Sequence, residues 1–181
     1  MRELKFRVWK PRQKSMFYPK ETIDIIQLPQ VMLDNGTDIL MEYMNKKDKD
    51  GKEIYEGDII VYRSVSRKTL ATNDNGLVTY EPEEPIIKTE ILEVVFEHCA
   101  FCFRNEINIL TPLFTVMKYD ERQLLNDIVG CWDRYDFDLQ ADVEYLMKEH
   151  NLNSKDELID YLGVSVIGNI YENQELLTNG I

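Results

Sequence analysis

The sequence predicts a mainly β protein with a helical insertion, an α+β fold built around a small barrel. Three observations support this. Alternating apolar and polar residues open the chain and indicate a β-hairpin. An acid-Gly-Asp turn at Glu56, Gly57 and Asp58 then leads into the β-branched run 59–61, as in many small barrels. Between 118 and 163, apolar residues recur at helical spacing.

The first element is a hairpin at the start of the chain. A polar turn spans 11–14, and residues 16–18 begin the return strand. Two sets of residues alternate before the turn: Leu4, Phe6 and Val8 in one set, and Lys5, Arg7 and Trp9 in the other. This period of two predicts a half-buried strand, whose basic residues we expect on the solvated face.

The next stretch is rich in turns. Residues 21–44 predict short extended pieces with a favoured type I′ turn at 34–36. A second hairpin turn is centred on Gly51, which we expect in a left-handed conformation. A calcium-binding EF-hand loop is not predicted here, because two of its ligand positions would fall on Lys46 and Gly57.

A long polar segment follows the strand that the acid-Gly-Asp turn opens. We expect residues 64–90 to form an extended arm, with a tight turn at 73–76 and a chain-breaking segment at 81–85. Strands are predicted again at 91–96 and 100–103.

Three helices are predicted in the last third of the chain. The spacing of apolar residues indicates helices over 121–129 and 138–150. A capping box at Ser154 begins a third helix, and Gly163 ends it. A final strand is expected over 164–170.

Composition sets broad limits on the class of protein. The chain has 181 residues, of which 44% are hydrophobic and 30% charged, and its net charge is -12. This is typical of a globular protein. The apolar runs are too short to span a bilayer, and no apolar segment follows the basic N-terminus as in a secretion signal. We therefore expect no membrane association and a location in the cytoplasm.

The cysteines are odd in number and are expected to be reduced, partly buried thiols: Cys99, Cys102 and Cys131. Cys99 and Cys102 form a CxxC beside His98, for which the alternatives are a zinc site or a redox pair. Residues three apart in a strand point to opposite faces, and zinc needs four ligands, so Cys131 would have to join a site. We expect no metal and no cofactor.

Charge is distributed unevenly along the chain. Residues 1–20 carry a net charge of +6. Their bases include four candidate phosphate contacts: Lys5, Arg7, Lys10 and Arg12. Residues 118–162 carry a net charge of -7 and contain a dense acidic cluster: Asp133, Asp136, Asp138, Asp142 and Glu144. The cluster is a solvated helix start, a docking face for a basic partner, or a set of metal ligands.

Three segments carry recognisable motifs: 2–9, 49–61 with Asp50-Gly51-Lys52-Glu53-Ile54-Tyr55-Glu56-Gly57-Asp58, and 167–177 with Gly168-Asn169-Ile170-Tyr171. In this order they resemble the YopX family of phage and prophage proteins, with a looser match at 93–104. The resemblance implies an SH3-like barrel and a bacterial host cell, but it implies no activity.

The resemblance and the breaks in pattern divide the chain into four parts. These are a β-hairpin region, 1–44; an SH3-like barrel, 45–116 plus 164–177, from which the arm 64–90 extends; a helical insertion, 118–163; and a tail, 178–181.

The sequence contains no recognisable nucleophile triad and no phosphate-binding glycine loop, so we expect no enzyme. The favoured hypothesis is a phage accessory protein that binds a host or phage protein. One version is an inhibitor of a host nucleic-acid-binding or defence protein, acting through the acidic face. The alternative is a nucleic-acid-binding module that uses the basic hairpin. Homo-oligomerisation through exposed strand edges is also expected.

Overall fold

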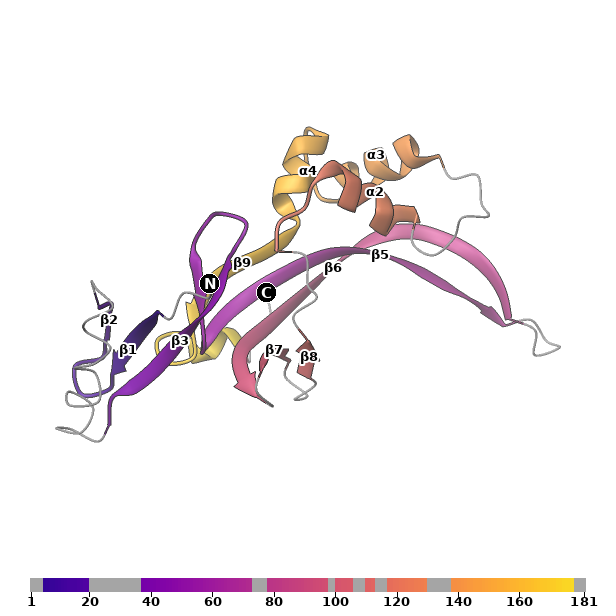
Figure 1. The fold of residues 1–181 in the computed structure, drawn as a ribbon. Coiled ribbons are helices and arrows are strands. Elements are labelled where there is room, and N and C mark those ends of the chain that lie inside the picture. The colour runs from indigo at the N-terminus through magenta and orange to yellow at the C-terminus, as the bar shows by residue number, and fades with distance from the viewer. Residues whose placement is uncertain are drawn as a thin grey trace. The chain divides into compact units, whose positions relative to one another are not determined.

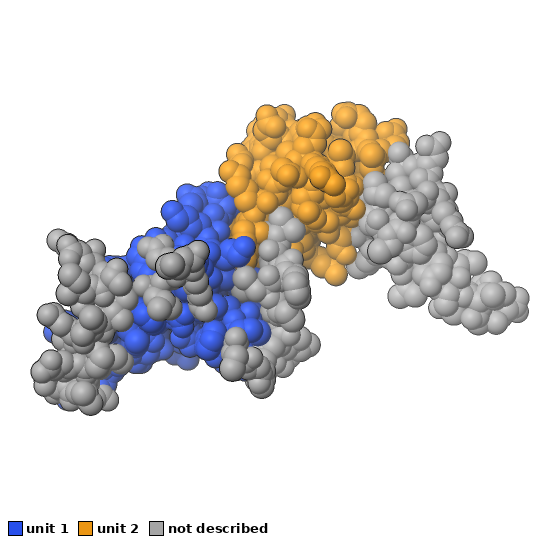
Figure 2. Space-filling model, viewed as in Figure 1, with its two compact units in different colours: residues 1–61, 91–115, 165–181 blue, residues 62–90, 116–164 orange. Residues whose placement is uncertain are grey.

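The computed structural model describes residues 5–19, 37–72, 78–97, 100–105, 110–112, 117–129 and 138–177. These residues form a mostly β protein with three α-helices, an α+β fold (Figure 1). The chain divides into two compact units (Figure 2). Unit 1 comprises residues 1–61, 91–115 and 165–181, and unit 2 comprises 62–90 and 116–164.

The first sheet has the strand order β2-β1-β3-β4. Its strands are β1 Phe6–Lys10, β2 Ser15–Phe17, β3 Ile39–Lys47 and β4 Glu53–Tyr55. Strands β1 and β2 pair antiparallel, with Trp9 opposite Met16, which confirms the predicted N-terminal hairpin. The turn predicted at 34–36 lies outside the described residues.

The second sheet has the order β8-β7-β6-β5-β9. Its strands are β5 Asp58–Thr72, β6 Val78–Glu97, β7 Ala100–Arg104, β8 Leu110–Pro112 and β9 Gly163–Asn169. Strand β7 pairs antiparallel with both β6 and β8. The SH3-like barrel and the four-part division of the chain stay predictions.

The prediction that Arg7 lies on the solvated face of the first strand is wrong. Arg7 is only 3% exposed, and its neighbours Val8 and Trp9 are 1% and 6% exposed, so the middle of β1 is buried on both faces. Trp9 belongs to an aromatic core that also contains Met41, Tyr43 and Tyr55. The alternation of residues along the strand does not predict the burial of Arg7, because its charge is compensated by a carboxylate that is distant in the sequence (below).

The turn between β3 and β4 confirms the left-handed glycine, since Gly51 has φ +85°. The Asp48 side chain closes this turn by accepting hydrogen bonds from the backbone N–H groups of Asp50 and Lys52, at 3.0 and 2.8 Å. Its second oxygen accepts from the Val166 N–H at 3.0 Å, which joins the turn to β9. Both carboxylate oxygens of the buried Asp48 therefore accept hydrogen bonds from backbone N–H groups.

The three helices are α2 Glu121–Val129, α3 Leu139–Glu149 and α4 Lys155–Tyr161, followed by the 3₁₀ helix η1 Gln174–Leu177. Asp138 caps α3 through the Ala141 N–H, and Ser154 caps α4 through the Glu157 N–H. These caps confirm the predicted helix starts. The Glu157 carboxylate reaches back to Asn153 rather than to the Ser154 N–H of an ideal capping box.

A hydrophobic core holds unit 2 together. Its buried members come from the helices and the strands: Val65, Tyr119, Leu124, Ile128, Val143, Leu146, Leu158 and Leu162. Ile87 of β6 packs against this core. The described residues of the predicted arm, 64–90, therefore belong to strands β5 and β6. Val65 and Ile87 of these strands pack against the helices.

Two glycines in left-handed backbone differ in their surroundings. A Cβ atom added at Gly51 would meet nothing within 4 Å. At Gly163 (φ +91°), it would lie 2.6 Å from the Met117 carbonyl oxygen. The chain re-enters β9 at Gly163 because only glycine allows both this conformation and this close approach.

We expect Gly51→Ala to lower the free energy of unfolding by about 1 kcal/mol, the cost of left-handed backbone alone. Gly163→Ala should lower it by roughly 3 kcal/mol, because backbone at Met117 must also move. Urea unfolding of both variants followed by far-UV circular dichroism tests this difference. An equal decrease in the free energy of unfolding for both variants would show that the close approach at Gly163 does not contribute to stability.

Candidate functional site

A buried ion pair lies at the centre of unit 1. The Arg7 guanidinium donates from Nη2 to Asp58 Oδ1 at 2.6 Å, and both side chains are at most 4% exposed. The other Asp58 oxygen accepts from the Tyr55 N–H at 2.8 Å. Burial raises the pKa of the Asp58 carboxyl, although Arg7 and the Tyr55 N–H both favour its charged form.

A second, more exposed pair continues this network. Lys5 Nζ lies 2.5 and 2.6 Å from the two oxygens of Glu53, and the Tyr55 hydroxyl donates to Glu53 at 2.8 Å. Although burial favours the neutral acid, these two donors hold the pKa of Glu53 below its usual value. The Arg7 guanidinium lies 4.7 Å from the centre of the Tyr55 ring, a cation–π contact.

The third family-like segment joins the same centre. Gly57 donates its N–H to the Val94 carbonyl and accepts from the Ile170 N–H, at 2.7 and 2.9 Å. Trp9 stacks on Tyr171, with ring centroids 5.8 Å apart. The segments 2–9, 49–61 and 167–177, far apart in sequence, therefore meet in unit 1 at described residues of each.

Carboxyl groups gather beside Tyr171 in the same unit. Burial, together with the charges of Glu42 and Glu93, raises the pKa of Glu56. Burial also raises the pKa of Glu93, which Arg104 partly offsets at 3.6 Å. Within the described residues, however, no group of three or more acids, histidines or cysteines is placed to hold a metal ion.

Only three of the five acidic residues of the predicted docking face lie among the described residues. Asp133 and Asp136 lie outside the described residues. Asp138 is exposed at the N-terminus of α3, Glu144 is exposed and accepts from Gln140, and Asp142 is half-buried in the first turn. The structure places these three acids on one helix, whose apolar residues Val143 and Leu146 are buried. Described residues 117–129 and 138–162 hold ten acidic and four basic residues.

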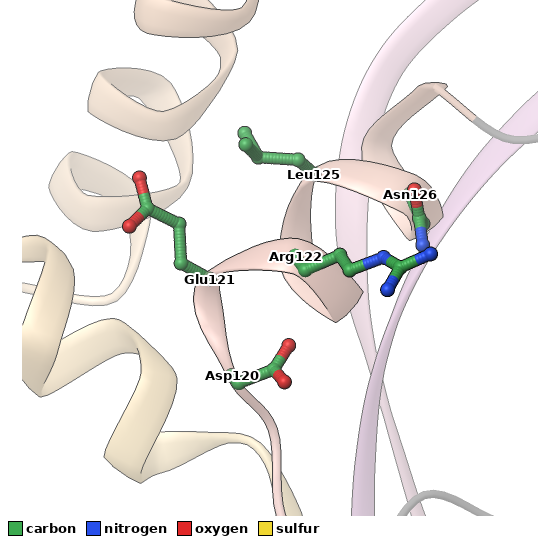
Figure 3. A pocket seen from close by; sticks show the side chains of 5 residues that line it. All are labelled: Asp120, Glu121, Arg122, Leu125 and Asn126. Atoms are coloured by element: carbon green, nitrogen blue, oxygen red, sulfur yellow. The ribbon is translucent and has the colours of Figure 1, made fainter.

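A shallow depression of about 540 Å³ lies at the start of α2. It is lined by Asp120, Glu121, Arg122, Leu125 and Asn126 (Figure 3). In Figure 3 the side chains of Glu121 and Leu125 extend to one side of α2 and that of Arg122 to the other. Glu121 already pairs with Lys155 at 2.6 Å, and no described cysteine or histidine lines the depression.

The four candidate phosphate contacts separate into two groups. Lys5 is paired with Glu53, and the buried Arg7 is paired with Asp58, so Arg7 is not presented to a ligand. Lys10 and Arg12 lie at the turn end of the hairpin. The sequence analysis missed the two exposed aromatic residues beside them, Phe17 and Tyr18, at 44% and 57% exposure. Adjacent aromatics next to a basic turn were the available signal.

Of the three cysteines, the structure describes Cys102, a buried thiol in β7. Cys99 and Cys131 lie outside the described residues. No helix among the residues that the structure describes is long and apolar enough to cross a membrane.

Comparison with known proteins finds a matching family and similar solved structures. The model of the family described as YopX protein matches residues 5–178. The crystal structure of protein EF1440 from Enterococcus faecalis is similar at 18% identity, with a TM-score of 0.41, over 98% of this chain and 99% of that chain. A comparison with curated proteins finds no match.

Replacing Arg7 with Met tests the ion pair. Because Asp58 would be left charged and buried, we expect the free energy of unfolding to fall by about 3 kcal/mol or more. The double variant Arg7→Met with Asp58→Asn should be more stable than the Arg7→Met protein, since no buried charge is left unpaired. Urea unfolding of the three proteins measures this, and strictly additive losses would contradict it.

Glu56 makes stability depend on pH. Its pKa is raised above the ordinary value of 4.5 in the folded state. Between the two pKa values the folded chain binds more protons than the unfolded chain, so stability falls as pH rises through that window. We expect Glu56→Gln to raise the Tm at pH 7, with the gain vanishing as pH falls below 4.5. The exposed control Glu144→Gln should change the Tm little; an equal gain there would refute the explanation.

Proposed function

We propose that this chain, which belongs to the YopX family, is a phage- or prophage-encoded accessory protein that binds another protein and is not an enzyme. Its partner is a host or phage protein with a basic surface. The specific version is an inhibitor of a host nucleic-acid-binding or defence protein, in which acidic side chains on α3 take the place of phosphates.

One observation carries this proposal: unit 2 directs its acidic residues outward from a stable apolar core. Leu146 is 1% and Val143 is 4% exposed on α3, whereas Asp138 and Glu144 on the same helix are exposed. Residues 117–129 and 138–162 hold ten acids against four bases, and such an excess of negative charge attracts a cationic protein over a long range and speeds its association. The same charge repels nucleic acid.

The proposal includes the setting of the protein. The turn at Gly57, which opens β5 after β4, supports an SH3-like scaffold in unit 1. The family resemblance supports a location in the cytoplasm of a bacterial host cell.

The triple variant Asp138→Asn, Asp142→Asn and Glu144→Gln tests the acidic face. Asparagine also caps helices, so α3 should keep its start. In a pull-down from nuclease-treated bacterial lysate, we expect a protein captured in stoichiometric amount by the wild type to be reduced at least about tenfold, because charge steers the association.

A matched control removes three charges elsewhere in unit 2: Asp120→Asn, Asp156→Asn and Asp160→Asn. It too changes one helix-capping aspartate, since Asp120 accepts from the Gln123 N–H at 2.7 Å. Capture should survive in this control. Undiminished capture by the α3 variant, or equal loss in both variants, would rule out α3 as the docking face.

A further inference from the structure

We propose that the turn end of the β1–β2 hairpin is a contact site for single-stranded nucleic acid. In this site Phe17 is the base-stacking side chain, and Lys10, Arg12 and Lys14 contact phosphates. The inference goes beyond the protein-binding function above, because it concerns unit 1 and a different ligand.

The structure concentrates positive charge at this end of the hairpin. Residues 5–19 contain five basic residues and no acidic residue. Glu53 and Asp58 neutralise two of them, Lys5 and Arg7. Lys10, which ends β1, and the exposed Lys14 lie at the turn, and the exposed Arg12 lies between them in sequence. The candidate phosphate contacts are therefore a different set from the one that the sequence predicts.

The strand register places an aromatic ring beside these cations. Ser15 lies opposite Lys10, and Phe17 lies opposite Val8, so Lys10 and Phe17 share one face of the hairpin. This face is the reverse of the one that packs Trp9 and Met16 into the aromatic core. Lys10 Nζ lies 4.9 Å from the centroid of the Phe17 ring, which leaves 44% of Phe17 exposed.

Hydrogen bonds and restricted dihedral angles fix the backbone of the turn from which these cations project. The Gln13 N–H donates to the Lys10 carbonyl at 3.1 Å, and the Lys14 N–H donates to the Pro11 carbonyl at 3.4 Å. Pro11 restricts its own φ, and Lys14 adopts φ +48° to enter the return strand. A preorganised turn loses less conformational entropy when it binds an extended ligand.

An exposed ring beside fixed cations suits a single strand better than a duplex. Single-strand-binding proteins combine a basic surface with aromatic side chains on which unpaired bases stack. In a duplex the base faces are already stacked, so Phe17 would add nothing. The sequence as a whole carries an excess of acidic residues, which disfavours contact with phosphates elsewhere.

The test is fluorescence anisotropy of labelled fifteen-residue oligothymidylate with the full chain, repeated over a range of salt concentrations. Three neutralised phosphates predict a slope of about -2 for log K against log salt. A duplex of the same length should bind more weakly. Unlabelled polyglutamate serves as the competitor that represents an acidic protein segment.

Two matched pairs of variants separate stacking from charge. Phe17→Leu should weaken oligothymidylate binding about tenfold. Phe96→Leu should not, although Phe96 is 40% exposed in the same unit and packs on Phe101. Lys10→Gln with Lys14→Gln should cut the salt slope by more than half. Lys46→Gln with Lys47→Gln, which removes two exposed lysines of β3, should leave the slope unchanged.

Three results would overturn the proposal. The first is no binding of oligothymidylate at low salt. The second is an affinity for oligothymidylate that Phe17→Leu leaves unchanged and that equals the affinity for the duplex. That result would indicate attraction by charge alone. The third is displacement of oligothymidylate by polyglutamate, if the binding of polyglutamate is also weakened by Phe17→Leu. That result would assign the site to an acidic protein. None of these results bears on capture through α3, because the variants lie in different units.

Discussion

The ion pair between Arg7 and Asp58 is the constraint on which unit 1 depends. Two charges inside an apolar core are costly to desolvate, and they are tolerated only with close, hydrogen-bonded geometry. This cost is offset by the 2.6 Å contact between the two side chains, by the Tyr55 N–H that donates to Asp58 and by the Tyr55 ring beside Arg7. Arg7 Nε has no hydrogen-bond partner. The pair thus joins the middle of β1 to the start of β5.

That constraint also decides which charges are available to ligands. By engaging Lys5 and Arg7 inside unit 1, the fold leaves the positive charge of the hairpin at its turn end, next to Phe17. In unit 2 the apolar spacing of α3 has the converse effect, because it buries Val143 and Leu146 and leaves the acids outside. A strongly acidic chain thereby has, among its described residues, a local cationic surface at the hairpin turn.

Local patterns predicted local structure well. The three helices, the cap at Ser154 and the turn at Gly51 follow from short-range spacing and side-chain chemistry, and all agree with the structure. The pairing of Arg7 with Asp58 could not be predicted, since it joins positions 51 residues apart and no local pattern encodes it. For the same reason Arg7 was expected on the solvated face of β1 and was counted as a candidate phosphate contact. Phe17 was missed because exposure depends on which strand face meets the core.

The hydrogen bond from the Val164 N–H to the Met117 carbonyl, at 3.0 Å, has a consequence for how this chain can vary. It brings the two ends of the helical segment of unit 2 to one point, with Gly163 shaped to fit there. A segment that leaves and returns at the same place can change in length without moving β9, and loop-closure entropy grows by only about 0.6 kcal/mol for each doubling of length. The helical segment can therefore change in length at little cost to β9, provided that it still covers Val65 and Ile87 of the sheet.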